Sequence, residues 1–523
     1  MTDTVGLVER SLASEARETF LERVDRQAAD LRAAIEAGRY DNDQFAVGLE
    51  VEVYAVRQPG DGVGGSSEGQ TPGDERACQL APLPGAAFDG PANKELGVHN
   101  AELNTAPDVF DGGGLAAQAA AIRDRLERAR ADARSAGREL VLDAMWTVPP
   151  AGGSYDYLAA IERRDGVVVA EHMQPDPRYV AIDNQSLGHG GGSLTLSVPG
   201  FEQEFPTILF ESLATSIQPH LQIPAAADFP DYYNAAIRTL GPVLALATNS
   251  PFLPGDLYGG VDPDRLLAGT DHELRIAAFE QSVGLSANPK VRVPRDIGTA
   301  TDAVDRIVDD DVYAPFLREW LEDSDRETLA DRYWEFAHKR STYWRWLRCV
   351  VGGDPVGSGD ERSLRVEYRP LPTQPTVRDV VGLQALVAGL VRGLVAADHP
   401  VADLPWAAAE ESFYNAVADG PDADLAWLTA DGERTDDGAV VYEEIFDHAR
   451  LGLREAGVPA REIDRYLEPI EARREAGTAP SAWKIARVRE ELAEGRSIED
   501  AIAAMQREYV RRSRESTTFA EWL

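Results

Sequence analysis

The sequence is poor in cysteine and offers no histidine pattern for zinc. Its 523 residues include only two cysteines, Cys78 and Cys349, too few for a disulfide framework or a cysteine-based zinc site. The eight histidines lack the paired spacing that binds zinc. Unpaired cysteines fit a reducing compartment, and the N-terminus has no charged-then-apolar secretion signal. We therefore expect a cytoplasmic protein.

Lysine is also scarce, and basic residues are outnumbered by acidic ones. The chain has 52 Lys+Arg against 89 Asp+Glu and a formal net charge of −37. The acidic residues are spread over the whole length, which is typical of proteins kept soluble in the salt-rich cytoplasm of a halophile. Nothing resembles a basic patch, so we expect no nucleic-acid partner. No apolar run approaches a membrane span, so we expect no membrane partner either.

The most informative segment is Gly48-Leu-Glu-Val-Glu-Val-Tyr54. Its alternation predicts a strand, and a side-chain period of two places Glu50 and Glu52 on the same face. Val51 and Val53 then face a core. Neighbouring carboxylates repel each other unless a cation lies between them, and oxygen-rich sites suit magnesium bound with nucleotide phosphates. The alternative is an edge strand with a solvated acidic face.

Two further segments place polar side chains on predicted strands. In Ser216-Ile-Gln-Pro-His220-Leu-Gln222, His220 and Gln222 alternate with apolar neighbours. A lone histidine there is either a hydrogen-bonded core residue or a ligand. In Ser363-Leu-Arg-Val-Glu-Tyr-Arg369, the residues Arg365, Glu367 and Arg369 share a face, and such charges on a buried strand must meet each other or a ligand.

Two more segments are candidates for the same site. Glu95 and Glu102 are an odd number of residues apart, so a straight strand would separate them, but Gly97 allows a turn that brings them together. The segment Asn249-Ser-Pro-Phe252 is predicted as a helix end whose loop, including Ser250, could line a pocket.

The rest of the chain mixes strands and helices without a regular strand–helix alternation. This favours an α+β fold with a large, mainly antiparallel sheet. Helices are predicted at 7–38, 115–137, 205–216, 232–247 and 376–397, and a Gly/Ser/Pro-rich surface loop at 57–75. A glycine-rich turn at 188–193 is either a hairpin loop or a phosphate contact. We expect an N-terminal helical segment at 1–43, a main domain at 44–400 and a helical C-terminal extension at 401–523.

Taken together, the order and spacing of these motifs resemble the glutamate–cysteine ligases and related carboxylate–amine ligases. The motifs that carry the resemblance are Gly48-Leu-Glu50-Val-Glu52, Glu95, Glu102-Leu-Asn-Thr-Ala-Pro107, Trp146-Thr-Val-Pro-Pro150, Arg178-Tyr179, His220-Leu-Gln222-Ile, Leu244-Ala-Leu-Ala-Thr-Asn-Ser-Pro-Phe252 and Arg365-Val-Glu367-Tyr-Arg369. Two motifs depart from the family pattern: the segment at 146–150 lacks a glycine and a histidine, and Gln222 replaces a second histidine. The resemblance covers roughly residues 44–397.

The resemblance implies a glutamine synthetase-like fold with a curved active-site funnel, and an ATP-dependent ligase that joins glutamate to cysteine through an acyl phosphate. It implies Mg²⁺, with Mn²⁺ as an alternative, held by five carboxylates: Glu50, Glu52, Glu95, Glu102 and Glu367. His220 would complete a metal site or bind phosphate. Arg365 and Arg369 would clamp anions. The expected nucleotide-binding residues are Arg178, Gln222, Ser250 and Arg365.

Three functions remain open at this point. The first is a glutamate–cysteine ligase that makes γ-glutamylcysteine. The second keeps the fold and ATP but uses another amine or acid, which the departures from the family pattern and the C-terminal extension favour. The third is a non-catalytic paralogue that binds nucleotide or a partner protein, which the retained carboxylates and arginines disfavour. A homo-oligomer is compatible with the sequence, which has no feature that demonstrates one.

Overall fold

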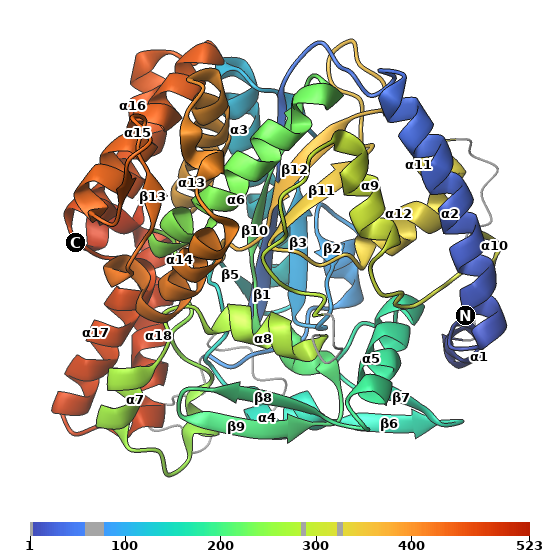
Figure 1. Ribbon diagram of the computed structural model, residues 1–523. Helices are drawn as coiled ribbons and strands as arrows, with labels where there is room; N and C mark the ends of the chain where they lie inside the picture. The colour runs from blue at the N-terminus through green and yellow to red at the C-terminus, as the bar shows by residue number, and fades with distance from the viewer. Residues whose placement is uncertain (1–3, 58–77, 284–288, 322–327) are drawn as a thin grey trace.

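An antiparallel sheet of eight strands forms the centre of the part of the protein that the computed structural model describes, which is residues 4–57, 78–283, 289–321 and 328–523 (Figure 1). Its main path runs β11–β12–β10–β1–β3–β2, and β4 and β5 also pair with β1. The strands are β1 (Ala46–Arg57), β2 (Asn93–Lys94), β3 (Asn100–Asn104), β4 (Asp108–Val109), β5 (Arg138–Val141), β10 (Ile217–Ile223), β11 (Leu347–Val351) and β12 (Leu364–Tyr368). The α+β class and the antiparallel sheet are therefore confirmed.

Strand β1 is central because both of its edges are paired. Glu50 lies opposite Gln218 of β10 and Asn104 of β3, and Glu52 lies opposite Glu102 of β3. The predicted alternation holds, since Val51 and Val53 are at most 1% exposed on the other face. That face belongs to the hydrophobic core, so the register of β1 is fixed and the two glutamates must emerge together.

Two long helices pack against the sheet: α3 (Gly112–Ser135) contacts β1 and β5, and α13 (Val377–Ala396) contacts β10. Both begin at side-chain caps. Asp111 accepts a hydrogen bond from the Gly114 amide, and Thr376 accepts one from the Asp379 amide. Helix α3 ends before Gly137, whose φ of +69° lets the chain turn back into β5.

The C-terminal region is a helical layer beside α13 and α6 (Phe229–Ala245), drawn in orange and red in Figure 1. Helices α13 and α15 approach each other closely at glycines. A Cβ atom added at Gly393 would collide with the His448 carbonyl oxygen, and one added at Gly452 would collide with the Gly389 carbonyl oxygen. The helices of this layer are α14 (Trp406–Asp419), α15 (Gly438–Glu455), α16 (Ala460–Glu475), α17 (Pro480–Ala493) and α18 (Ile498–Glu515).

The remaining elements surround the other edges of the sheet. The N-terminal helices α1 (Thr4–Ser11) and α2 (Ser14–Glu36) lie on the opposite side of the molecule from the C-terminal layer, and α2 packs on α9 (Ala300–Val308) and α12 (Trp334–Ser341) (Figure 1). The shorter elements are α4 (Ser154–Ala159), α5 (Pro177–His189), α7 (Pro263–Gly269), α8 (Leu274–Ser282), α10 (Arg318–Leu321), α11 (Leu329–Arg332), and the pairs β6–β7 (Ile161–Arg164, Val167–Ala170), β8–β9 (Leu194–Val198, Phe201–Phe205) and β13–β14 (Trp427–Leu428, Arg434–Thr435).

Two sequence predictions are corrected by the structure. The helix predicted at 205–216 is only a short 3-10 turn, Ile208–Leu213, because Phe205 ends β9 and the Thr215 amide donates to the Ala144 carbonyl in an extended segment. The statement that no apolar run approaches a membrane span is also wrong. Helix α13 is apolar and long enough, but 83% of its most apolar window is buried inside the protein, so it is a core helix. The loop predicted at 57–75 lies almost entirely outside the described residues.

Candidate active site

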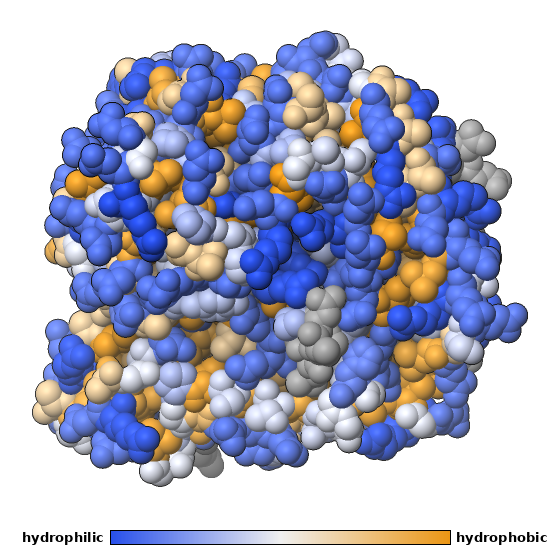
Figure 2. Space-filling model, viewed as in Figure 1, coloured by the Kyte–Doolittle hydropathy of each residue, from blue (hydrophilic) through white to orange (hydrophobic). Residues whose placement is uncertain are grey.

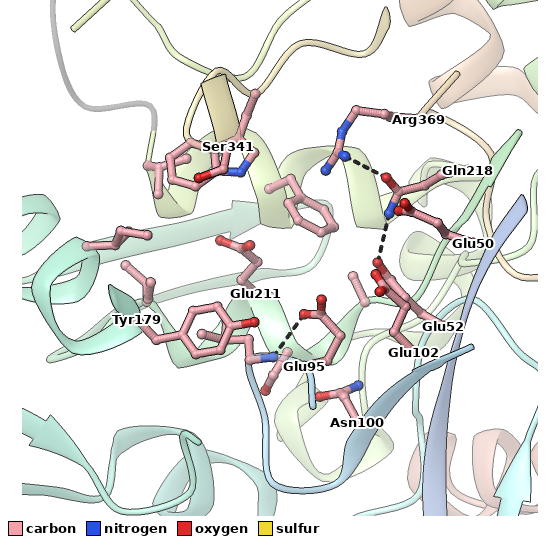
Figure 3. A pocket seen from close by; sticks show the side chains of 18 of the residues that line it. Glu50, Glu52, Glu95, Asn100, Glu102, Tyr179, Glu211, Gln218, Ser341 and Arg369 are labelled. Atoms are coloured by element: carbon pink, nitrogen blue, oxygen red, sulfur yellow. Dashed lines mark hydrogen bonds between the residues drawn. The ribbon is translucent and has the colours of Figure 1, made fainter. Parts of the chain in front are cut away.

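A cavity of about 250 Å³ opens beside β1 and β3 and is lined by acidic side chains. Glu50 and Glu52 come from β1, Glu102 from β3, and Glu95 from the segment before the turn at Gly97. Glu211 reaches the same cavity from the 3-10 turn Ile208–Leu213. Figure 3 shows these five carboxylates converging on one space, which we call the glutamate pocket.

Three of these carboxylates form a tight group. One oxygen each of Glu52, Glu95 and Glu102 lie within 4.8 Å of one another. Burial, then the charge of a neighbouring carboxylate, raises the pKa of Glu52 to about 7 and that of Glu95 to about 8, and burial followed by Glu50 and Glu95 raises the pKa of Glu102 well above its usual value. Such crowding is costly unless the charge is balanced.

The hydrogen bonds to this group come from neutral donors. Glu52 accepts from the Ser216 amide at 2.7 Å and from Gln218 Nε2 at 3.1 Å. Glu95 accepts from the Leu96 amide at 2.9 Å, and Glu102 accepts from Asn104 Nδ2 at 2.7 Å. Within the described ranges no lysine or arginine forms an ion pair with any of the three, so the acidic group lacks a direct protein counter-charge.

A second group joins Glu50, His220 and Glu367, whose ligand atoms also lie within 4.8 Å of one another. His220 Nε2 is 3.3 Å from Glu50 Oε1, yet neither ring nitrogen has a hydrogen-bond partner among the described residues, although both are buried. Burial would raise the pKa of Glu50, but the neighbouring His220 outweighs it and lowers that pKa. An imidazole whose ligand atom lies close to two carboxylates is a donor set that a divalent cation can use.

Glu367 differs from the five carboxylates of the glutamate pocket because arginines already bind it. Arg348 Nη2 and Nε donate to it at 2.7 and 2.9 Å, and Arg369 also pairs with it. These guanidinium groups outweigh the effect of burial and hold the pKa of Glu367 far below its usual range. The predicted face shared by Glu367 and Arg369 is therefore present, while Arg348 is a partner that the sequence did not indicate.

The structure separates the predicted binding residues into two sets. Arg178 and Arg369 line the glutamate pocket, where Arg178 Nη2 donates to the Ser341 carbonyl at 2.9 Å and Arg369 Nη1 donates to Gln218 Oε1 at 2.5 Å. Arg365, Gln222 and Ser250 lie outside the pocket lining.

Each residue of the outer set is held by a protein group. Arg365 Nη2 donates to the Gly352 carbonyl at 3.0 Å, and Gln222 Nε2 donates to the Gln44 carbonyl at 3.2 Å. Ser250 is 1% exposed and donates to Glu273 at 2.7 Å. Their roles in binding stay predictions, and the pocket lining gives them no support.

Several pocket residues were not identified from the sequence. Gln218 bridges Glu52 and Arg369 from β10, two residues before His220 on the same strand. Glu211 accepts from Ser282 Oγ at 2.6 Å, and burial raises its pKa to about 7. Trp344 also lines the pocket, whereas Trp346 is 3% exposed in the core.

Comparison with known protein families decides the identity of the chain at family level. Glutamate-cysteine ligase family 2 (GCS2) matches residues 46–516. The chain belongs to this family. Its members are ATP-dependent carboxylate–amine ligases, so the enzyme class expected from the motifs is confirmed at this level. The match runs through the C-terminal helices, well beyond residue 397, where the recognisable motifs end. Comparison with curated protein sequences finds no match.

Solved structures similar to this family member share little sequence with it. A glutamate–cysteine ligase from Francisella tularensis in complex with AMP is 15% identical, with 91% of each chain covered and a TM-score of 0.49. A bifunctional glutathione synthetase from Pasteurella multocida is 12% identical, with 93% of this chain and 55% of that chain covered and a TM-score of 0.45. The ligase PafA in complex with the prokaryotic ubiquitin-like protein Pup is 10% identical, with 90% and 74% covered and a TM-score of 0.38.

Proposed function

We propose that this protein is an ATP-dependent ligase that joins glutamate to the amino group of cysteine, giving γ-glutamylcysteine through an acyl phosphate. The observation that carries the proposal is a pair of potential metal-ligand groups at one cavity edged by arginines. Glu52, Glu95 and Glu102 line that cavity, and so does Glu50, whose group includes His220 and Glu367. Phosphoryl transfer needs charge neutralisation and alignment more than it needs a nucleophilic side chain.

The donor set of the pocket fits hard divalent cations. The carboxylates are oxygen donors, which Mg²⁺ and Mn²⁺ prefer, and the raised pKa values of Glu52 and Glu95 reflect burial and crowding that a cation relieves. Glu52, Glu95 and Glu102 would hold one cation, and Glu50 and His220 a second. When bound, these ions supply neutralisation of the phosphate oxygens.

The remaining steps use the protein's own residues. The γ-carboxylate of glutamate attacks the γ-phosphate of ATP and ADP leaves, while Arg369 and Arg178 neutralise the developing charge. The amine nitrogen then attacks the acyl carbon, phosphate leaves, and the amine loses a proton. Glu211 is suited to take that proton, since burial raises its pKa to about 7 and the Ser282 hydroxyl orients it.

A second candidate keeps this chemistry and changes the amine. Ile182, Ile208, Phe279 and Val283 also line the glutamate pocket and give it an apolar part. An amine with a larger apolar side chain than cysteine would bury more surface there.

Release of ADP tests both candidates. The protein is assayed in KCl with Mg-ATP and glutamate, first without amine, then with cysteine, then with a panel of other amines, and products are identified by mass spectrometry. Stimulation by cysteine with a γ-glutamyl product supports the first candidate, and stimulation only by another amine supports the second. Binding of Mg-ATP without turnover under any condition would contradict both and favour a non-catalytic paralogue.

A further inference from the structure

A second polar cavity, separate from the glutamate pocket, lies where the segment after α8 meets α9 and the segment before β11. It has a volume of about 110 Å³, and four of its seven lining residues are arginines: Arg292, Arg295, Arg306 and Arg345, with Asp309, Asp310 and Tyr343. We call it the arginine pocket. Figure 2 shows strongly hydrophilic side chains gathered near the centre of this face, between α8 and α9.

The arginine pocket carries excess positive charge in a protein whose net charge is −37. Of its two aspartates, Asp310 is already neutralised, because Arg345 Nη2 donates to it at 2.8 Å and Lys290 also pairs with it. Asp309 is exposed and forms no ion pair with any described residue. Arg292, Arg295 and Arg306 therefore line this cavity with Asp309 as the one lining carboxylate that has no ion pair to a described residue, and the carboxylate of Glu410 lies near Arg292 and Arg295.

Two of these arginines have donors without protein acceptors. Neither Arg292 nor Arg295 donates a side-chain hydrogen bond to any residue in the described ranges. The Arg295 Cζ lies over the Trp406 ring, 3.2 Å from its centroid, in a cation–π contact. Burial and the charges of Arg345 and Arg295 lower the pKa of Arg292, so the arginines repel one another when the cavity holds no anion.

We propose that the arginine pocket binds a small oxyanion of the phosphate class. Planar guanidinium groups bind tetrahedral oxyanions through paired charge-assisted hydrogen bonds, and an anion would relieve the repulsion among the arginines. The volume, less than half that of the glutamate pocket, suits a ligand no larger than a single phosphate group.

The arginine pocket and the glutamate pocket share one short segment of chain. Tyr343 and Arg345 line the arginine pocket, whereas Trp344 and Arg348 line the glutamate pocket. Lys290 connects them as well, because its ammonium pairs with Asp310 and lies 5.8 Å from the centre of the Trp344 ring. Arg345 is thus one residue from Trp344 and three residues from Arg348, both of which line the glutamate pocket.

Calorimetric titration of the full chain with inorganic phosphate, at one fixed KCl concentration, tests this site. The variants are Arg292→Gln and Arg295→Gln, which remove a free donor, and Arg163→Gln, an exposed arginine on β6 without a side-chain partner among the described residues. Arg369→Gln separates this site from phosphate binding in the glutamate pocket. Glucose 6-phosphate, titrated in parallel, distinguishes a phosphate ester from the free ion as the tighter ligand.

We expect Arg292→Gln and Arg295→Gln each to weaken phosphate binding by roughly tenfold or more, the loss of one charge-assisted hydrogen bond, while circular dichroism shows both variants to be folded like the wild type. Arg163→Gln should bind phosphate as the wild type does. Arg369→Gln, a change in the glutamate pocket, should keep phosphate binding in the arginine pocket at the wild-type affinity. Wild-type affinity in both Arg292→Gln and Arg295→Gln would overturn the proposal. So would the loss of all phosphate binding in Arg369→Gln alone, or the absence of binding by either ligand to the wild-type protein.

Discussion

Lys484 on α17 donates a hydrogen bond to Asp143, which lies just after β5 and 341 positions earlier in the chain. The Nζ–Oδ1 distance is 2.5 Å, and the two side chains are 1% and 0% exposed. Lys484 also donates to the Asn249 carbonyl at 2.7 Å, and Asp143 accepts from Gln506 of α18 at 2.7 Å. The C-terminal helices are therefore joined to the segments behind the sheet by a buried ion pair with satisfied partners.

Lys484→Met should destabilise the protein strongly. The substitution leaves Asp143 as a buried charge without its counter-ion, which typically costs about 3–5 kcal/mol. Chemical denaturation should show the loss as a lower midpoint with an unchanged slope. Lys94→Met, at an exposed position on β2, serves as the matched control and should change little.

The double variant Asp143→Asn/Lys484→Met separates charge from packing. It removes both charges, so it should be less destabilised than the sum of the single variants. Strict additivity would mean that the ion pair itself contributes nothing.

A chain truncated after residue 400 should fail to fold. Arg473, fully buried on α16, donates to Asp379 of α13 at 2.8 Å and to Gln374 at 2.7 Å. The truncation therefore leaves the buried Asp379 carboxylate without its counter-ion and also exposes α13. Expression followed by size-exclusion chromatography and circular dichroism should reveal aggregated or unfolded material. A soluble, fully active 1–400 fragment would contradict this and would make the C-terminal layer dispensable.

Glu50→Gln should abolish ligase turnover while leaving the fold intact. The amide keeps the size of the side chain but removes a charge from the Glu50–His220–Glu367 group, and loss of one group that stabilises transition-state charge typically costs about 100-fold or more. Steady-state ADP release and thermal unfolding measure the two effects separately. Glu171→Gln, an exposed control, should behave as wild type in both. Wild-type turnover in Glu50→Gln would remove the metal argument.

Stability of the metal-free protein should fall as pH rises through the neutral range. The pKa values of Glu52 and Glu95 are raised in the folded protein to about 7 and about 8, so folding favours their protonated forms. The contribution is complete below the ordinary carboxyl pKa near 4.5 and is lost as pH rises through the raised values. Thermal unfolding in EDTA between pH 5 and about pH 9 should show this loss.

Glu102→Gln should flatten that pH dependence, because it removes one of the three crowded carboxylates and lowers the repulsion on the other two. Addition of Mg²⁺ to the wild-type protein near pH 7 should release protons, detected as a binding heat that varies with the ionisation enthalpy of the buffer. Two results together would contradict the assignment of this group: a pH profile of stability as steep in Glu102→Gln as in the wild type, and no proton release when Mg²⁺ is added to the wild-type protein.

The sequence predicted the acidic half of the site because strand alternation is a local rule. Glu50 and Glu52 follow from the period of β1 alone, and Glu95 follows from the turn that Gly97 permits. Arg348 could not be found this way. Its partnership with Glu367 depends on the cross-strand register of β11 and β12, which places these two residues opposite each other and which no local pattern encodes.

The errors have a similar origin. Residues 205–216 have helical composition, but tertiary hydrogen bonds from Thr215 to Asp143 and Ala144 hold the end of the segment extended. Ser250, whose role in binding stays a prediction, follows a helix in the sequence as expected, but in the structure it is buried and bonded to Glu273 and Arg275. Local chemistry thus predicted which residue types the pocket needs, while the contacts that fill or block space came from distant parts of the chain.

Helix α13 also bears on how the protein is made. A ribosome completes every strand of the main sheet and then α13 before it begins α15 and α16, the helices that cover α13. For that interval of translation, a helix that has the length and composition of a membrane span lacks the partners that bury it in the folded protein. The speed at which residues 397–475 are synthesised therefore determines how long the nascent chain presents a false membrane signal.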